Sequence, residues 1–483
     1  MPEPAARTGR RESSLRYVSS RGDAPNLGFA DVLLAGLATD GGLYVPETWP
    51  TLSPETIASF AGRPYADVAL EVLTPFVGED IAPADMERMV REAYATFRHP
   101  AVAPLVQVGD RHFVLELFHG PTLAFKDVAM QLLSRLMDHV LAKRERRATI
   151  VGATSGDTGG AAIAAFAGSD RTDMFILFPK GRVSPVQQRQ MTTAGRLNVH
   201  PIAIEGTFDD CQALVKAMFN DHRFRAESAL SGVNSINWAR IMAQIVYYFT
   251  AAASVGAPRR PVSFTVPTGN FGDIFAGYAA KRMGLPVERL IIATNRNDIL
   301  ERTLKTGRYE MEGVHASMSP SMDIEISSNF ERLLFEASGR DAATVRRLMD
   351  QLRQSGAFTL PEDMIARIRA EFDAGRTDEA KTAETIKAYL GTTAYLLDPH
   401  TAVGVSVADR HMGDVAMITL GTAHPAKFPA SVKAACGIEP PLPPSHADLM
   451  TRDETFDVLP NDLDAVQSYI RERSRAVRYG AAA

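Results

Sequence analysis

Short apolar runs alternate with helix-like segments along most of the chain, and this alternation constrains the fold more than any other feature of the sequence. Each run is rich in β-branched residues and ends at glycine or polar residues, after which a helical pattern begins. The runs cover residues 149–152, 174–178, 199–204, 262–266, 290–293 and 415–420. Continuous apolar strands separated by helices are typical of parallel sheets that are covered on both faces. The expected fold class is therefore α/β.

Regions of a different character flank this alternating pattern. Residues 1–100 combine turn-rich and helical segments, which indicates a mainly helical N-terminal domain ahead of a strand-and-helix region at 101–435. Residues 340–395 are charged and have helical periodicity, and we expect no strands there. Residues 436–483 begin close to a proline-rich stretch and are expected to form a linker and a tail. A chain of 483 residues has room for two or three domains.

Charge and cysteine content exclude several classes of protein. The formal net charge is -5 and no basic block occurs, which argues against a nucleic-acid partner. Cys211 and Cys436 are too few for a disulfide framework and lack metal-binding spacing, so a reducing, cytoplasmic location is expected. Residues 241–255 form the longest apolar-rich stretch, which is too short to span a bilayer. No apolar stretch follows the arginines of residues 1–14, so neither a membrane partner nor a signal peptide is expected.

Two glycine-rich loops that follow predicted strands are expected to bind anions. The first runs from Gly152 to Gly159 and the second from Gly269 to Asp273. Glycines let the backbone approach a ligand, and the free N–H groups at a helix N-terminus carry partial positive charge. Two such loops in one parallel-sheet protein indicate a phosphate-bearing ligand together with an anionic substrate. Asp273 would repel a phosphate if it faced the site, so we expect its side chain to point aside.

The first loop matches none of the common nucleotide-binding or nucleophile motifs. It lacks the G-x-G-x-x-G spacing, no Gly-Lys-Ser/Thr follows it, and Ser155 does not lie in G-x-S-x-G. The alternative to an anion site is a plain helix start, with Ser155, Asp157 or Thr158 as the capping group. The loop alone leaves both interpretations open.

Lys126 stands in an unusually apolar setting for a lysine. It follows Leu123-Ala124-Phe125 and lies just ahead of a helix-like stretch at 128–141. Burial disfavours the charged ammonium and can free the amine as a nucleophile that forms a Schiff base with an aldehyde. The alternative is a lysine whose stem packs against the protein while its charge reaches water.

Polar residues near two other predicted elements are further candidates. Thr422 follows the last strand, and its hydroxyl can meet a ring nitrogen as a neutral partner. His424 lies close by and can equally be a packed, hydrogen-bonded histidine. Asn237 and Arg240 lie at the start of the buried helix and either cap it or bind substrate; an arginine suits a carboxylate or phosphate through paired contacts.

Taken together, these segments resemble the threonine synthase family, a group within the tryptophan-synthase-like (fold type II) pyridoxal-phosphate enzymes. The resemblance covers nearly the whole chain in order, and its specificity comes from the conjunction of the runs. The matching runs are residues 120–127, 154–159, 235–240, 267–273, 398–402 and 422–428, together with Tyr17, Ser19, Arg21 and residues 38–46. It implies two open, twisted, largely parallel sheets with helices on both faces, preceded by a mainly helical N-terminal domain.

The resemblance also implies roles for the lysine and the loops. Lys126 would hold pyridoxal 5'-phosphate as a Schiff base, and Thr422 would face the pyridine nitrogen without forcing it to stay protonated. The cofactor phosphate would lie on the second loop, at Gly269, Asn270, Phe271 and Gly272. The substrate would meet the first loop, at Thr154, Ser155, Gly156, Asp157 and Thr158.

The implied reaction converts O-phospho-L-homoserine and water to L-threonine and phosphate, with Lys126 moving protons once substrate has displaced it. The substrate phosphate would use some of five polar residues that the sequence does not rank: Ser184, Gln188, Asn237, Arg240 and Lys427. Movement of residues 129–232 would close the site against water. A serine/threonine dehydratase-like lyase and a cofactor-binding paralogue without catalysis are the alternatives. Both a monomer and a homodimer stay open.

Overall fold

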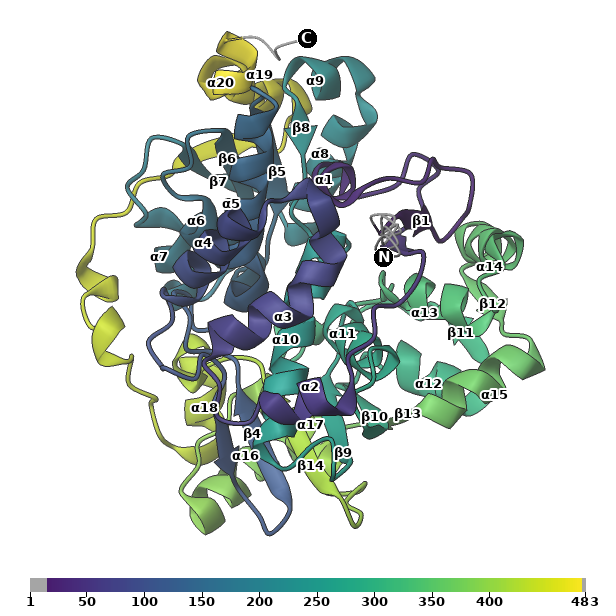
Figure 1. Cartoon of the computed structure of the whole chain (residues 1–483). Helices are drawn as coiled ribbons and strands as arrows, with labels where there is room; N and C mark the ends of the chain where they lie inside the picture. Colours follow the sequence, from purple (N-terminus) through teal and green to yellow (C-terminus); the bar gives the residue numbers. More distant parts are fainter. Residues whose placement is uncertain (1–14, 480–483) are drawn as a thin grey trace, which may run out of the picture.

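The computed structural model describes residues 15–479, and most of its strands lie in two separate sheets (Figure 1). The larger sheet has the strand order β13-β10-β9-β14-β4-β3, in which all neighbours are parallel except the edge pair β3 and β4. Its strands are β3 (Leu105–Gln107), β4 (His112–Glu116), β9 (Val262–Pro267), β10 (Val287–Thr294), β13 (Phe372–Arg376) and β14 (Ala416–Gly421).

Helices cover both faces of the larger sheet. Along β10, Leu290 and Ile292 belong to the main core, which includes helices α10 and α11, whereas Ile291 and Ala293 pack with Val403 and its neighbours in α17. Successive side chains of a strand point to opposite faces, so this alternation shows a sheet buried on both sides. The helices of this part are α10 (Trp238–Ser254), α11 (Gly272–Arg282), α12 (Ile299–Thr306), α13 (Phe330–Ala337), α14 (Ala342–Ser355), α15 (Glu362–Glu371), α16 (Glu379–Thr393), α17 (Pro399–Ala408) and α18 (Pro429–Cys436).

The smaller sheet is parallel throughout, with the order β15-β7-β6-β5-β8. Its strands are β5 (Ala148–Ala153), β6 (Thr172–Pro179), β7 (Val199–Glu205), β8 (Leu230–Ser231) and β15 (Asp457–Pro460). Along β6, Met174 and Ile176 face the main core, whereas Phe175 and Leu177 face a second core. The helices around this sheet are α5 (Lys126–Lys143), α6 (Asp157–Phe166), α7 (Pro185–Thr192), α8 (Phe208–Asn220), α9 (His222–Glu227), α19 (Leu463–Arg473) and α20 (Arg475–Arg478).

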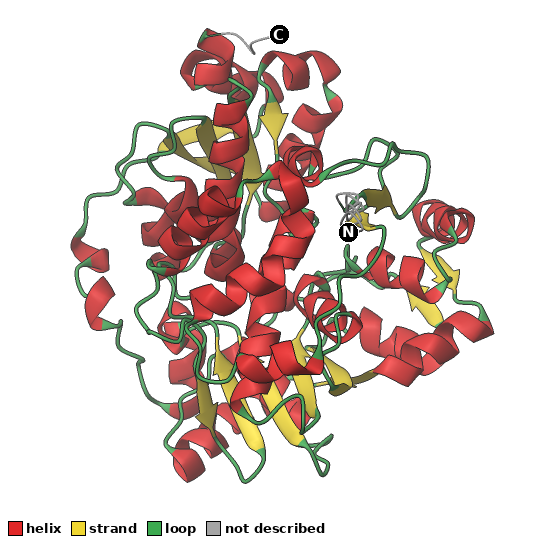
Figure 2. Cartoon of the chain, in the orientation of Figure 1, coloured by secondary structure: helices red, strands yellow, loops and turns green. Residues whose placement is uncertain are grey.

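The N-terminal region is mainly helical (Figure 2), and its buried side chains belong to the same core as those of α10. The Tyr17 ring lies 5.9 Å from the Trp238 ring at the start of α10, and the Tyr17 hydroxyl donates to Phe76 O at 2.7 Å. The elements here are β1 (Tyr17–Ser19), α1 (Phe29–Ala35), β2 (Tyr44–Pro46), α2 (Pro54–Ser59), α3 (Tyr65–Val77) and α4 (Pro83–Tyr94). No helix in the described part of the chain has the length and apolar composition that crossing a bilayer requires.

Two stretches contain strands that the sequence did not indicate. Residues 340–395 include β13 and also β12 (Ala357–Thr359), which pairs with β11 (Arg308–Glu310), so the expectation of a purely helical segment is wrong. The expected C-terminal tail adds β15 to the edge of the smaller sheet, and Val466 and Ile470 of α19 are fully buried in its second core. Both β13 and β15 are short edge strands with polar residues, so they lack the continuous apolar pattern of a central strand.

The remaining turns of helix are short and lie in connecting segments. They are η1 (Gly78–Asp80), η2 (Pro320–Met322), η3 (Pro425–Lys427), η4 (Pro444–His446) and η5 (Leu449–Thr451). The loops singled out by the sequence follow the ends of β5, β9 and β14. Parallel α/β sheets bind ligands at the carboxyl ends of their strands, so a ligand site is expected at these three loops.

Candidate active site

Lys126 is the first residue of helix α5, and the segment ahead of it is fastened to the end of strand β14. The N–H of Phe125 donates to Thr422 O at 2.9 Å, and the N–H of His424 donates to Leu123 O at 3.0 Å. These contacts place the lysine at the carboxyl end of the larger sheet. Only 9% of Lys126 is exposed. Its ammonium group therefore does not extend into solvent, as the alternative interpretation of this lysine requires.

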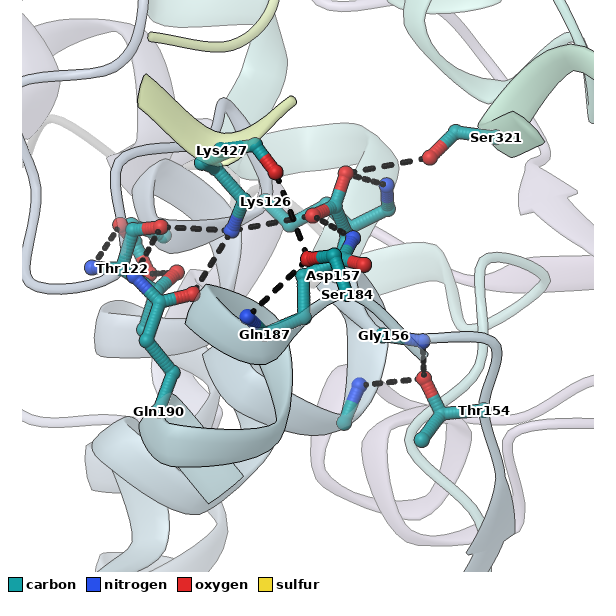
Figure 3. A network of polar contacts seen from close by, with 12 residues as sticks. Thr122, Lys126, Thr154, Gly156, Asp157, Ser184, Gln187, Gln190, Ser321 and Lys427 are labelled. Atoms are coloured by element: carbon teal, nitrogen blue, oxygen red, sulfur yellow. Dashed lines mark hydrogen bonds and ion pairs between the residues drawn. The ribbon is translucent and has the colours of Figure 1, made fainter. Parts of the chain in front are cut away.

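The carboxylate of Asp157 lies between two buried lysines (Figure 3). Its Oδ1 is 2.9 Å from Lys427 Nζ, and its Oδ2 is 3.5 Å from Lys126 Nζ. Asp157 begins α6 beside the smaller sheet, whereas Lys427 follows β14 of the larger sheet. The Lys427 ammonium also donates to Thr122 O at 2.7 Å and to Gln190 Oε1 at 2.9 Å. The cluster therefore joins the two sheet-containing bodies at the ends of their strands.

The charged groups of this cluster shift the pKa values of Lys126 and Asp157. Burial lowers the pKa of Lys126, Asp157 partly opposes that shift, and the positive charges of Arg240 and Lys427 add to it. Burial works to raise the pKa of Asp157, but Lys427 and Lys126 hold it well below its usual range. Asp157 is therefore ionised at neutral pH, and Lys126 releases its proton more readily than an exposed lysine. This is the state that a nucleophilic lysine needs.

Thr154 shapes the first anion loop. Its hydroxyl accepts the N–H groups of Gly156 and Gly159, each at 2.9 Å. Gly156 has φ +143°, and a Cβ there would lie 2.4 Å from Cδ of Gln187, so only glycine fits without displacing a neighbour. The backbone of this loop is thus set by Thr154 and by the absence of a side chain at Gly156.

The side chains of the same loop have separate environments. Among the hydrogen bonds of residues 15–479, none gives a helix-capping role to Ser155, Asp157 or Thr158. Ser155 is exposed and Thr158 half-buried, and both remain accessible to a ligand. The plain-cap interpretation therefore does not account for these residues.

The second anion loop joins β9 to α11 in a left-handed turn. Phe271, the residue before α11, has φ 64°, and the helix begins at Gly272. The free N–H groups of the first turn of α11 thereby lie at the end of the strand. A Cβ on Gly269 would lie 2.8 Å from both Ser321 O and Ile324 Cδ1, so this loop is tightly covered by the segment that contains η2.

Asp273 points away from the second loop, as expected. Its carboxylate accepts the hydroxyls of Tyr247 and Tyr248 in α10, the latter at 3.2 Å. Burial raises the pKa of Asp273 to about 7, although both tyrosines and Lys126 oppose the shift. The carboxyl group is therefore partly protonated at neutral pH, which reduces the repulsion that it would exert on a phosphate at the loop.

Thr422 and His424 follow β14 but differ in what they can do. Thr422 is 5% exposed, and its hydroxyl makes no hydrogen bond within residues 15–479, while its N–H donates to Thr401 Oγ1 at 3.2 Å. His424 accepts the N–H of Ala426 at Nδ1 (3.1 Å), and burial lowers its pKa to about 4. His424 is thus a packed neutral histidine, and Thr422 is the group free to meet a ligand.

Arg240 is a buried cation with few partners. It is 3% exposed, one of its terminal nitrogens donates to Val233 O at 3.3 Å, and its Nε has no hydrogen-bond partner within residues 15–479. Burial lowers its pKa to about 10, so the guanidinium is charged at neutral pH. Among the described residues none forms an ion pair with it. A buried charge in this state favours the approach of an anion.

Two of the five candidates for the substrate phosphate are engaged elsewhere. Asn237 caps α10 by accepting the N–H of Ala239 (3.0 Å), and it donates to Leu33 O at 2.9 Å. Gln188 is half-buried and donates to Glu454 at 3.2 Å. Both side chains therefore already have partners within the protein, one as a helix cap and one in a contact with Glu454.

The sequence missed three residues that approach Asp157. Gln187 donates to Asp157 Oδ1 at 2.9 Å, and Ser321 donates to Oδ2 at 3.1 Å. His400 Nε2 accepts the N–H of Ser321 at 3.2 Å, and its Nδ1 lies 2.8 Å from Asp398. Ser184, which was predicted, lies beside this group and donates to the backbone carbonyl of Lys427 at 3.3 Å. Only the 398–402 run held a sequence signal for any of the missed residues.

The assembled groups fit one cofactor. A buried lysine with a lowered pKa, a helix N-terminus beside a glycine loop, and a buried hydroxyl with no partner match the aldehyde, the phosphate and the ring nitrogen of pyridoxal phosphate. Together with the two parallel sheets they define a pyridoxal-phosphate-dependent enzyme of fold type II.

Comparison with known families confirms this class and narrows it. Residues 96–417 match the family described as "Pyridoxal-phosphate dependent enzyme". Residues 16–94 match "Threonine synthase N terminus", and residues 401–470 match "Threonine synthase, C-terminal". The chain belongs to the threonine synthase family. The predictions of fold class, family and cofactor are confirmed.

Individual relatives agree with this placement. A threonine synthase of Pseudomonas aeruginosa is 56% identical over 95% of this chain and 98% of its own length. The crystal structure of pyridoxal-phosphate-bound threonine synthase from Brucella melitensis has 67% identity and a TM-score of 0.95, covering 96% of this chain and 100% of that one. The yeast threonine synthase structure has 40% identity and a TM-score of 0.91, covering 95% and 99%.

Proposed function

We propose that the protein converts O-phospho-L-homoserine and water to L-threonine and phosphate. The observation that carries this proposal is the excess of buried positive charge at the site. The buried ammonium groups of Lys126 and Lys427 both contact the carboxylate of Asp157, and the Arg240 guanidinium adds positive charge beside Lys126. A substrate with both a carboxylate and a phosphate supplies the negative charge that such a site lacks.

Lys126 has two roles in this proposal. It holds the cofactor, and once the substrate amine has taken its place, Nζ accepts the proton from the substrate Cα and returns protons later in the reaction. Pyridoxal phosphate, when bound, supplies an electron sink for the negative charge that develops on the substrate. Nζ also removes a proton from Cβ, so that phosphate leaves from Cγ with the electron pair of the C–O bond. Water then adds at Cβ, and protons return to Cγ and Cα. The lowered pKa of Lys126 suits a group that must both accept and release protons.

The remaining residues are proposed to bind and orient. The N–H groups and hydroxyls of residues 154–158 receive the substrate carboxylate, and Arg240 and Lys427 receive its phosphate, with Ser184 beside them. The loop from Gly269 to Gly272 holds the cofactor phosphate on the N-terminus of α11, and Thr422 meets the pyridine nitrogen. Asn237 and Gln188, whose side chains already make hydrogen bonds within the protein, are further candidates for the substrate phosphate.

Closure is proposed to involve the body built on the smaller sheet. Asp157 in that body contacts Lys427 and Ser321 from the rest of the chain, so the site is complete only when the two bodies meet. We propose that residues 129–232 move together with the C-terminal residues of β15 and α19, because β15 is hydrogen-bonded to β7. A cytoplasmic location is also proposed, since both cysteines are free thiols. Monomer and homodimer both fit this proposal.

The test is release of inorganic phosphate from O-phospho-L-homoserine, with L-threonine identified as the organic product. Serine and threonine are the comparison substrates, and formation of a keto acid from them would identify a dehydratase instead. Binding of the cofactor without turnover of any of these compounds would identify a non-catalytic paralogue. The proposal requires phosphate and threonine in equal amounts.

A further inference from the structure

Arg332 is a buried cation that the proposed reaction does not use. It lies in α13 and is fully buried. Its Nε donates to Tyr44 O at 3.0 Å, one terminal nitrogen donates to Ile236 O at 2.6 Å, and the other donates to Asn329 Oδ1. All three partners are neutral, and in the described part of the chain Arg332 forms no ion pair.

The neighbouring carboxylate does not neutralise this charge. Glu331 accepts the hydroxyl of Ser20 at 2.6 Å and binds the Arg21 guanidinium at 2.9 and 3.0 Å. Burial lowers the pKa of Arg332 to about 9, with Glu331 opposing the shift, so Arg332 remains charged at neutral pH. A fully buried charge with only neutral acceptors is unfavourable unless an anion lies near enough to compensate it.

Asn329 connects Arg332 to the second anion loop. Its backbone N–H and its side-chain Nδ2 both donate to Asn270 O, each at 3.0 Å, and Nδ2 also contacts Ser235 O at 3.3 Å. A Cβ on Gly272 would lie 3.3 Å from Asn329 Nδ2, so the amide packs directly against the loop. Arg332 therefore holds Asn329 from one side while Asn329 holds the loop from the other.

We propose that Arg332 is a positioning residue for the cofactor phosphate, acting through Asn329 on the loop from Gly269 to Gly272. Its charge favours a dianion on that loop, and its hydrogen bonds to Asn329 and to Ile236 O hold the loop against the 234–240 segment that carries Arg240. This inference rests on the proposed function, in which that loop binds the cofactor phosphate. Hydrogen bonds in series within a buried site polarise one another, which transmits the charge.

The same arrangement gives the N-terminal region a part in cofactor binding. Tyr44 O accepts a hydrogen bond from Arg332 and belongs to β2, which pairs with β1 within the N-terminal region. The hydrogen bonds of Arg332 thus connect the cofactor loop to Tyr44, which lies far from that loop in sequence. A change at β2 that moved Tyr44 O would free one arm of the guanidinium.

The experiment compares pyridoxal phosphate with pyridoxal, which lacks the phosphate, on apoprotein carrying Arg332→Gln. Dissociation constants come from the visible absorbance of the bound cofactor. We expect binding of pyridoxal phosphate to weaken by about tenfold or more and binding of pyridoxal to change by less than about twofold. Equal weakening of both compounds, or no weakening of either, would overturn the proposal. Arg340→Gln is the matched control, because Arg340 also donates to carbonyls near β2, those of Pro46 and Glu47, but pairs with Glu336.

Two further variants keep the proposal testable if Arg332→Gln fails to fold. Arg332→Lys retains the charge but not the three-way geometry, and we expect it to keep part of the preference for pyridoxal phosphate. Asn329→Asp places a carboxylate against the loop, and we expect it to weaken pyridoxal phosphate selectively. A loss of preference in the lysine variant together with unchanged preference in the aspartate variant would refute the idea. If wild-type protein binds pyridoxal phosphate but releases no phosphate from O-phospho-L-homoserine, the proposed function fails while this proposal stands.

Discussion

Asp157 and Lys427 form an enclosed ion pair, with 2.9 Å between Oδ1 and Nζ, that links α6 of the smaller body to the segment after β14 of the larger one. The second oxygen of the same carboxylate faces Lys126 at 3.5 Å. One carboxylate therefore serves both the contact between the bodies and the charge state of the proposed cofactor lysine.

Replacing Asp157 by Asn should destabilise the protein markedly. The change leaves Lys427 buried without a counter-charge, and breaking a buried pair in this way typically costs about 3 kcal/mol or more. Urea unfolding of the apoprotein measures the loss. Glu205→Gln removes the exposed pair between Lys180 and Glu205 and should change stability by less than about 1 kcal/mol. Similar losses in the two variants would contradict this assignment.

The same Asp157→Asn variant should shift the pH dependence of cofactor attachment. Asp157 raises the pKa of Lys126 against the effect of burial, so its removal lowers that pKa further. The neutral amine is then present at lower pH, and the rate at which apoprotein takes up pyridoxal phosphate should reach half its maximum at a more acidic pH. Stopped-flow absorbance measures this midpoint. A shift toward alkaline pH would show that Asp157 does not act on Lys126.

Lys126→Ala should abolish the visible absorbance of added pyridoxal phosphate and its fixation by borohydride. Without the amine no covalent link can form between the protein and the cofactor aldehyde. Lys143→Ala, at the exposed end of the same helix, should leave both signals unchanged. Retention of the borohydride-fixed cofactor in the Lys126 variant would assign the attachment to another lysine.

Asp273 should give the protein a distinctive pH profile of stability. Burial raises its pKa to about 7, so between the usual carboxyl range and that value the folded state holds a proton that the unfolded state releases. Stability then falls as pH rises from about 4 to about 7, by up to about 4 kcal/mol for a shift of about three pH units. Asp273→Asn removes this contribution, so its advantage over wild type should grow across the same window. Urea unfolding gives the free energy of unfolding of both proteins at each pH. A constant difference between wild type and variant across this window would show that the pKa of Asp273 is not raised.

Gly156→Ala should impair substrate binding without removing the cofactor. The added Cβ would lie 2.4 Å from Gln187 Cδ, which displaces the Gln187 amide from its hydrogen bond to Asp157 or shifts the loop, and the φ of +143° strains the alanine backbone. We expect KM for the substrate to rise by about tenfold or more while the visible absorbance stays. Gly168→Ala is matched for backbone strain, with φ +85°, but its Cβ meets nothing within 4 Å, so KM should hold. Equal KM values in the Gly156 and Gly168 variants would show that the first loop does not bind the substrate.

The sequence predicted the central strands and their loops because buried parallel strands and glycine-rich turns leave strong local patterns. It did not predict β13 and β15, whose residues are partly exposed at sheet edges and read as loop or helix. The contact with Gln187 in place of Gln188 depends on the rotation of α7 about its axis, which packing decides. Arg332 follows a glutamate in a helix and resembles a surface residue in sequence, since nothing local shows that backbone carbonyls from two distant segments accept its hydrogen bonds.

The place of β15 has a consequence for how the protein is made. Its residues 457–460 join the edge of a sheet whose other strands end by residue 231, and α19 closes the second core after that. A nascent chain therefore completes this body only after residues 457–473 have been synthesised, more than 200 residues beyond the other strands of the sheet. Until then the edge of β7 and the apolar surface that α19 covers stay open to other chains, so this interval is where newly made protein depends most on protection from aggregation.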